Sequence, residues 1–409
     1  MHHQPRAAES QPATTVSGAA LVTVMLCCAI AFLDGADTQA VAIAAPLIAR
    51  DLAIGPGPLG VIFSCSLFGA ALGAIGCGSL ADRYGPKRML LLCTVWFGGF
   101  QLATAHVDGY GALLVFRFLA GLGLGGATPC FLGLAAAQVA PRHRARCLGL
   151  LWGCFPIGGF VGGFVNGWIV EHRLWQAVFT IGGVAPLIVA MLLAVLANET
   201  RQPVVPAGAA AARGDPFALW RDPVLRRHMT LLGCICFGAF GTLAGIVVWM
   251  PTILVATGFR PAQGGAILSW NAVGALISMT SAGFLLERFG ARVLIIGFAA
   301  ATLLMIGLGT ALGSLAAVAA CMALLGVGLG VAASGGIAAT GQLLPAAMQS
   351  SGLGWAMGAG RLGQVGLPLL MGLALQRGVA AEWVLAASAG LPLAGAVAAL
   401  RLPRPAASA

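Results

Sequence analysis

The segment Gly78-Ser79-Leu80-Ala81-Asp82-Arg83-Tyr84-Gly85 returns 205 residues later as Gly283-Phe284-Leu285-Leu286-Glu287-Arg288-Phe289-Gly290. The two copies share a glycine, a leucine, an acid, an arginine, an aromatic residue and a final glycine in the same register. At the same offset, the run Gly121-Leu122-Gly123-Leu124-Gly125 returns as Gly326-Val327-Gly328-Leu329-Gly330. Agreement at two places with one offset indicates that the chain consists of two similar halves.

The composition excludes a water-soluble protein. Of 409 residues, 59% are hydrophobic and only 8% are charged, and the mean hydropathy is +0.95. This is too little charge to cover a soluble globule of that size. Apolar runs of about 20 residues match a hydrocarbon core about 30 Å thick, and helices satisfy their backbone polar groups internally. We therefore expect an all-α membrane protein and no enzyme activity.

The apolar runs predict twelve transmembrane helices, six on each side of one polar interruption. The expected organisation is a tail at 1–18, a six-helix bundle at 19–197, a linker at 198–228, a second six-helix bundle at 229–401 and a tail at 402–409. The first span is predicted at 19–42. Two bundles related by an internal repeat are typical of an alternating-access transporter.

The basic residues predict the orientation in the membrane. With both termini in the cytoplasm, 16 of the 22 lysines and arginines fall on the cytoplasmic side, as the positive-inside rule requires. The net charge of +10 comes from these short basic loops, so it does not indicate nucleic-acid binding. We expect a multi-pass protein of a bacterial-type inner membrane, in contact with the lipid bilayer.

Residues 78–88 resemble the signature loop between the second and third helices of the major facilitator superfamily. The segments 34–37, 117–126 and 360–363 resemble, more narrowly, the aromatic acid:H⁺ symporters of that superfamily. The resemblance implies the major facilitator fold and proton-driven uptake of an aromatic carboxylate, such as a hydroxybenzoate or a phenylpropionate. It also implies that the signature residues govern conformational change; we assign this gating role to Gly78, Asp82, Arg83, Gly85, Arg88, Glu287 and Arg288.

The chain departs from this family at three positions. Relatives commonly have an aromatic residue at Ala36, an asparagine near Cys130 and a glutamate at Gln138. The glutamine removes a titratable group, so any proton role of that glutamate is absent from this chain. These departures bear on the substrate and not on the transporter assignment.

Two carboxylates and one arginine in the first half are candidates for proton coupling. Asp34 and Asp37 lie well inside the first span, where an ionisable residue is costly and therefore a functional candidate. Their i, i+3 spacing places them on one helical face, and two close carboxylates resist being ionised together. Arg117 is predicted at the same depth, where it can neutralise the pair; the alternative is a permanent structural ion pair.

Arg361 is the candidate substrate clamp. It is predicted near the middle of the eleventh span, where no acid of the second half lies at the same depth, and its guanidinium can hold a carboxylate bidentately. The alternatives are helix carbonyls or Asp34 as its partner. A ring-shaped substrate also needs apolar walls; the candidates are Trp152, Phe155, Trp270 and Trp355, with Asn271 for a hydroxyl.

No metal site and no cofactor are expected. The eleven cysteines lie in or beside apolar segments, where cysteine behaves as a small hydrophobic residue, and their spacing implies no disulfide framework. Three alternatives to an aromatic acid symporter stay open: a symporter of another small organic anion, an exporter, and a non-transporting membrane sensor on the same fold. A sensor would need a signalling domain, which the linker and tails are too short to supply. We expect a monomer.

Overall fold

The computed structural model describes residues 18–172, 174–197, 221–345 and 348–402. The predicted tails and most of the predicted linker lie outside these residues. The first half forms six long helices and one short 3₁₀ turn, η1 (Pro141–His143). The helices are α1 (Gly18–Asp51), α2 (Pro56–Tyr84), α3 (Pro86–Thr104), α4 (Tyr110–Ala137), α5 (Arg144–His172) and α6 (Trp175–Leu196).

The second half repeats this arrangement. Its helices are α8 (Pro223–Ala256), α9 (Pro261–Phe289), α10 (Arg292–Ala311), α11 (Leu315–Leu343), α12 (Gln349–Gln376), α13 (Ala381–Ser388) and α14 (Gly390–Leu400). The last two follow each other as one apolar segment, Ala381–Leu400. In the described part of the chain, ten segments are long and apolar enough to span a bilayer. With the more polar helices α3 and α12, the described residues form the twelve transmembrane segments that the sequence predicted, and the predicted fold class is confirmed.

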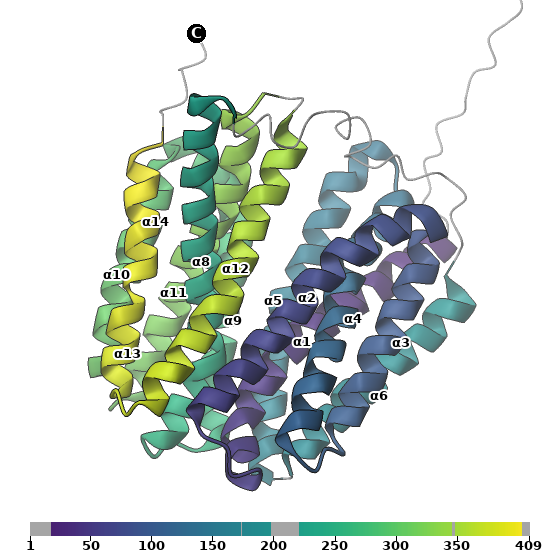
Figure 1. Cartoon of the computed structure of the whole chain (residues 1–409). Coiled ribbons are helices and arrows are strands. Elements are labelled where there is room, and N and C mark those ends of the chain that lie inside the picture. Colours follow the sequence, from purple (N-terminus) through teal and green to yellow (C-terminus); the bar gives the residue numbers. More distant parts are fainter. Residues whose placement is uncertain (1–17, 173, 198–220, 346–347, 403–409) are drawn as a thin grey trace, which may run out of the picture.

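The two halves form two bundles that lie side by side (Figure 1). In the first, α1 packs on α5 and α2 on α4; in the second, α8 packs on α12 and α9 on α11. Glycines permit the close approach, because a side chain at Gly125 would collide with the backbone of Ala70, and one at Gly274 with that of Ala323. The repeat seen in the sequence is therefore a repeat of helix packing.

The repeated signature segment ends a helix in the same way in both bundles. Gly85 follows α2 with φ of 89° and Gly290 follows α9 with φ of 59°, a region that favours glycine. Their N–H groups donate to the carbonyl oxygens of Ala81 and Leu286 at 2.9 and 2.8 Å. Each preceding arginine also lies over its aromatic neighbour, at 5.4 Å in the first copy and 5.7 Å in the second.

Two helices begin or end outside the predicted spans. α1 continues from the predicted end at 42 to Asp51, because Pro46 is accommodated within the helix and residues 40–45 are buried. α8 begins at Pro223, inside the predicted linker 198–228. The side chain of Asp222 caps this helix, accepting from the N–H groups of Val224 and Leu225 at 2.7 and 3.3 Å, and proline suits the first helical position.

The two bundles contact each other through α2 with α12 and α5 with α9. Across this interface, Ser64 Oγ donates to the carbonyl of Val365 at 2.7 Å, and Ser269 Oγ donates to that of Phe160 at 2.8 Å. The first turn of α2 and the last turn of α12 also meet, as do the last turn of α5 and the start of α9. We call this the closed end; the ribbons diverge towards the opposite end, where α14 ends (Figure 1).

Candidate functional site

The buried charges of the first bundle form an ion pair. Asp37 of α1 is 4% exposed and Arg117 of α4 is 3% exposed. Arg117 Nη2 lies 3.6 Å from Asp37 Oδ2. Charges at this depth are compensated when they are paired, and the structure brings together two of the three residues predicted for proton coupling.

Three further side chains complete the surroundings of this pair. Gln101 of α3 donates its amide N–H to Asp37 Oδ1 and accepts at Oε1 from Arg117 Nη1 at 2.5 Å. Arg117 Nη2 donates to Ser66 Oγ of α2 at 3.1 Å. The guanidinium carbon lies 5.6 Å from the ring centre of Phe179 of α6, within reach of a cation–π interaction. Five helices of one bundle thus meet at one charge network.

The second bundle lacks this network. At the repeat offset of 205 residues, Met322 corresponds to Arg117, and Asn271 to Ser66. The Asn271 amide donates to the carbonyl oxygen of Met322 at 3.0 Å, and Asn271 is 4% exposed. The repeat thus keeps the contact between neighbouring helices but replaces the cation with a thioether. This bond occupies an amide N–H of Asn271, the residue predicted to meet a substrate hydroxyl.

Asp34 faces a different partner. It lies one turn before Asp37 and is partly exposed, and its charge interacts with that of Arg361 on α12 of the other bundle. No ion pair within 4.0 Å joins these two described residues. Arg361 is also partly exposed, and its Nη1 donates to Gln364 Oε1 at 3.1 Å. The predicted carboxylate pair is therefore divided, with one member inside a bundle and the other facing across to the second bundle.

The predicted aromatic residues differ in their surroundings. Trp152, Trp270 and Trp355 are 41%, 47% and 45% exposed, so each has part of its ring surface uncovered by protein. Phe155 is partly buried, and its carbonyl oxygen packs against Gly35, so closely that a side chain at Gly35 would collide with it. Phe155 therefore lies on the helix that covers the acidic segment of α1.

The predicted gating residues lie where the signature segments end. Arg83 and Arg288 are exposed next to the glycines that terminate α2 and α9. Gly78 and Gly85 lie on the same segment, and Arg88 is exposed in the first turn of α3. The side chains of Asp82 and Glu287 lie outside the described residues, so their partners in this role stay predictions.

Gln101 is the main residue that the sequence analysis missed. It lies 15 residues after the start of α3 at Pro86, or about 23 Å along the helix at 1.5 Å per residue. That depth is close to the predicted depth of Asp37 and Arg117. A neutral polar residue inside an apolar span at the depth of two charges is the signal that could have found it.

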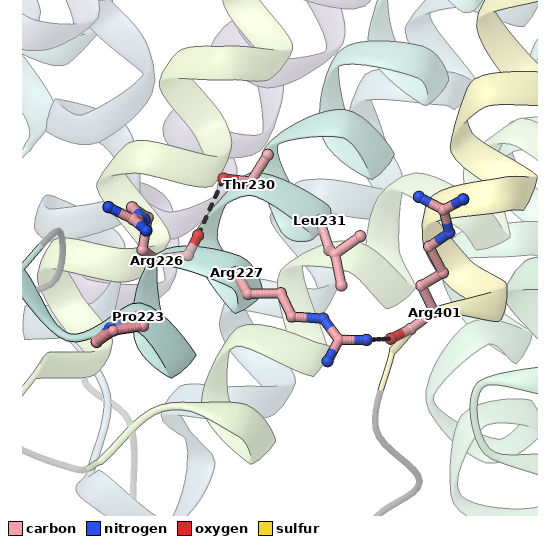
Figure 2. A pocket seen from close by; sticks show the side chains of 6 residues that line it. All are labelled: Pro223, Arg226, Arg227, Thr230, Leu231 and Arg401. Atoms are coloured by element: carbon pink, nitrogen blue, oxygen red, sulfur yellow. Dashed lines mark hydrogen bonds between the residues drawn. The ribbon is translucent and has the colours of Figure 1, made fainter.

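A cavity of about 360 Å³ lies elsewhere, between the first turns of α8 and the end of α14 (Figure 2). It is lined by Pro223, Arg226, Arg227, Thr230, Leu231 and Arg401. Arg227 Nη2 donates to the carbonyl of Arg401 at 3.5 Å. None of the residues of the buried network lines it. Within the described ranges, no three His, Cys, Asp or Glu side chains are grouped to hold a metal ion.

Comparison with known proteins identifies relatives over most of the chain. The family model of the Major Facilitator Superfamily matches residues 27–260. The 3-(3-hydroxy-phenyl)propionate transporter of Escherichia coli is 33% identical, over 92% of each chain. The 4-hydroxybenzoate transporter PcaK of Pseudomonas putida is 28% identical, over 84% of this chain and 83% of its own length. A gallate transporter of Pseudomonas putida is 27% identical, over 87% and 86%.

Solved structures share the fold. The nucleoside transporter NupG superposes with a TM-score of 0.78 at 16% identity, over 94% of this chain and 98% of its own. The D-xylose-proton symporter superposes with a TM-score of 0.73 at 16% identity, over 93% and 96%. At these identities the likeness is one of architecture.

Proposed function

The chain belongs to the major facilitator superfamily, and from this premise we propose that it imports an aromatic carboxylate together with protons by alternating access. Members of this family and the relatives compared above are transporters, so the protein is a membrane transporter and not an enzyme. The substrate class is supported by three relatives that carry a phenylpropionate, a hydroxybenzoate and a gallate. All three substrates combine an aromatic ring with a carboxylate.

Arg361 is the residue that we propose to hold the substrate carboxylate. The observation that carries this assignment is its position: it is a partly exposed intramembrane arginine that faces the other bundle, and no carboxylate of the described residues lies within 4.0 Å of it. A guanidinium in a poorly hydrated site needs an anion and binds a carboxylate through two parallel hydrogen bonds. Trp152, Trp270 and Trp355 supply ring surface for stacking, and Phe155 an apolar wall.

Proton coupling follows from the competition for Arg361. When Asp34 is ionised, its charge attracts Arg361 and opposes the entry of a second carboxylate. When Asp34 binds a proton, Arg361 is released and the substrate carboxylate takes its place, so proton and substrate bind together. Asp37, one turn nearer the closed end, gives the proton a second binding position beside Arg117.

We propose that both termini face the cytoplasm of a bacterial cell and that the protein lies in the inner membrane. The distribution of basic residues and the bacterial relatives support this assignment. The closed end then faces outwards, and the end at which the two bundles diverge faces the cytoplasm. Because one chain supplies both bundles and every residue assigned above, we propose that the monomer is the working unit.

Purified protein in liposomes provides the test. Adding an outside carboxylate should acidify the interior when the acid is of the hydroxybenzoate or phenylpropionate type, and aliphatic carboxylates should give no signal beyond protein-free liposomes. The readout is the fluorescence of a pH dye trapped inside. Acidification by aliphatic acids alone would overturn the substrate class, and uptake of radiolabelled aromatic acid without acidification would overturn proton coupling.

Asp34→Asn should separate binding from coupling. Because asparagine cannot ionise, the substrate carboxylate no longer competes with a negative charge at position 34 for Arg361. Substrate affinity should therefore become independent of pH between about 5 and 8, whereas wild-type affinity should fall as the pH rises and Asp34 ionises. Exchange of labelled for unlabelled substrate should persist, and uphill accumulation should be lost. Asp51→Asn is the matched control, since Asp51 lies in the same helix and accepts from Trp175 Nε1 at 2.9 Å. Uphill accumulation by Asp34→Asn would contradict the mechanism.

A further inference from the structure

Gln101 separates the two charges of the buried network. A carboxylate and a guanidinium that meet alone usually form two parallel hydrogen bonds of about 2.7–2.9 Å. Here the ion pair stands at 3.6 Å, because the amide of Gln101 occupies both ions: it donates to Asp37 Oδ1 and accepts from Arg117 Nη1. Gln101 is itself 0% exposed, so water does not substitute for it.

We propose that Gln101 is a positioning residue that keeps this ion pair open, so that Asp37 Oδ2 can take up and release a proton while Arg117 stays in place. The proposal rests on the proton-coupled function proposed above. It assigns the second binding position of the proton to one named oxygen and gives a neutral side chain the task of keeping that oxygen available.

The oxygen that takes up the proton is identified by the hydrogen bonds around the carboxylate. Asp37 Oδ1 accepts from Gln101, whereas Asp37 Oδ2 is buried and has no hydrogen-bond partner among the described residues. A proton arriving at Oδ2 therefore breaks no hydrogen bond. In a closed bidentate pair both oxygens would be occupied by the guanidinium, and protonation would have to break one of those bonds.

Arg117 keeps its own contacts when Asp37 becomes neutral. Gln101 Oε1 accepts from its Nη1, Ser66 Oγ accepts from its Nη2, and the ring of Phe179 lies over the guanidinium. None of these three partners carries a charge, so none is lost when the proton binds. The cation is thus held by neutral groups in both states of the carboxylate, and the helices need not repack with each proton.

The charged groups that act on Asp37 are few. Arg117 faces it from α4, and Asp34 lies one turn earlier in α1. The other helices at the network present neutral side chains: Gln101 from α3, Ser66 from α2 and Phe179 from α6. Arg361 of α12 acts on Asp34. A neutral substitution at Gln101 therefore alters the geometry of the pair without altering any charge.

The first test is Gln101→Leu, which keeps the side-chain volume and removes both hydrogen bonds. The pair should close, and the external pH of half-maximal proton-driven uptake should fall by about one unit, a tenfold higher proton concentration. Thr104→Val is the matched control: Thr104 is buried one turn later in α3, and its hydroxyl donates to the carbonyl oxygen of Phe100 in its own helix at 2.8 Å. The control should keep the wild-type profile.

The second variant, Gln101→Glu, keeps the shape of the side chain. It keeps the proposal testable if Gln101→Leu fails to fold. An ionised glutamate would pair with Arg117 and leave Asp37 beside a like charge, so half-maximal uptake should move to higher pH, opposite to Gln101→Leu. Opposite shifts in folded variants support the positioning role. Equal losses of uptake at all pH values, with an unchanged midpoint, would show a purely structural role and overturn it.

The two proposals fail in different ways. If wild-type proteoliposomes show no proton-driven uptake of any aromatic acid, the proposed function itself is wrong. If the wild type takes up the acid with protons and both Gln101 variants keep its pH profile, the function stands and the assignment of Gln101 is wrong.

Discussion

Replacing Arg361 with alanine should weaken binding of the aromatic acid severely while the protein still folds. Truncating one partner of a desolvated charge pair costs about 2–5 kcal/mol, so substrate affinity should fall by about 30-fold or more at saturating proton concentration. Folding should survive because, among the described residues, Arg361 makes no ion pair within 4.0 Å and one side-chain hydrogen bond, to Gln364 in its own helix. Binding can be measured by isothermal titration or by a scintillation proximity assay.

Two further arginine variants serve as controls for Arg361→Ala. Arg361→Lys keeps the charge but loses the planar fork, so it should recover part of the affinity. Arg377→Ala removes an exposed arginine at the end of the same helix and should bind like the wild type. Wild-type affinity in Arg361→Ala would show that Arg361 does not bind the substrate and that another residue binds its carboxylate.

The fold could be predicted from sequence because a bilayer imposes few solutions. The repeat of residues 78–85 at 283–290 fixed the two-bundle organisation, and the structure shows its physical basis in glycines that end both helices with positive φ. Helix ends were less accurate. Hydropathy indicates where an apolar segment ends. The start of α8 is instead set by the side chain of Asp222, which caps the helix through local hydrogen bonds in a polar region.

The site was predictable in part. Charge in an apolar span identified Asp34, Asp37, Arg117 and Arg361 as candidates, but spacing alone placed both carboxylates on one face. Two residues separated by three positions differ by about 60° around the helix axis, which follows from 3.6 residues per turn. At a boundary between bundles that angle turns Asp37 towards Arg117 and leaves Asp34 facing Arg361. Tertiary packing decides which partner each carboxylate faces, and the helical period alone does not predict it.

Asp37→Asn should destabilise the protein. It leaves the guanidinium of Arg117 buried without a counter-charge. The neutral partners Gln101, Ser66 and Phe179 compensate that charge in part, so the loss should be smaller than the cost of breaking a buried ion pair, about 3–5 kcal/mol. Arg117→Met should be milder, because a carboxylate left alone can become neutral by binding a proton, whereas a guanidinium cannot lose one. Thermal stability in detergent, followed by fluorescence-detected size exclusion, should rank the wild type above Arg117→Met, and Arg117→Met above Asp37→Asn.

The double variant Asp37→Asn with Arg117→Met then separates stability from coupling. The second bundle already places Met322 at the position that corresponds to Arg117, so this packing accepts a methionine there. Removing both charges should restore stability close to that of the wild type, since replacing a buried pair with apolar groups is often neutral or stabilising. Proton-driven accumulation should be lost in Asp37→Asn and in the double variant alike, because Asp37 Oδ2 is gone. If the stable double variant accumulates substrate as the wild type does, the buried pair is a structural element of the first bundle, and the whole of the coupling falls to Asp34 and Arg361.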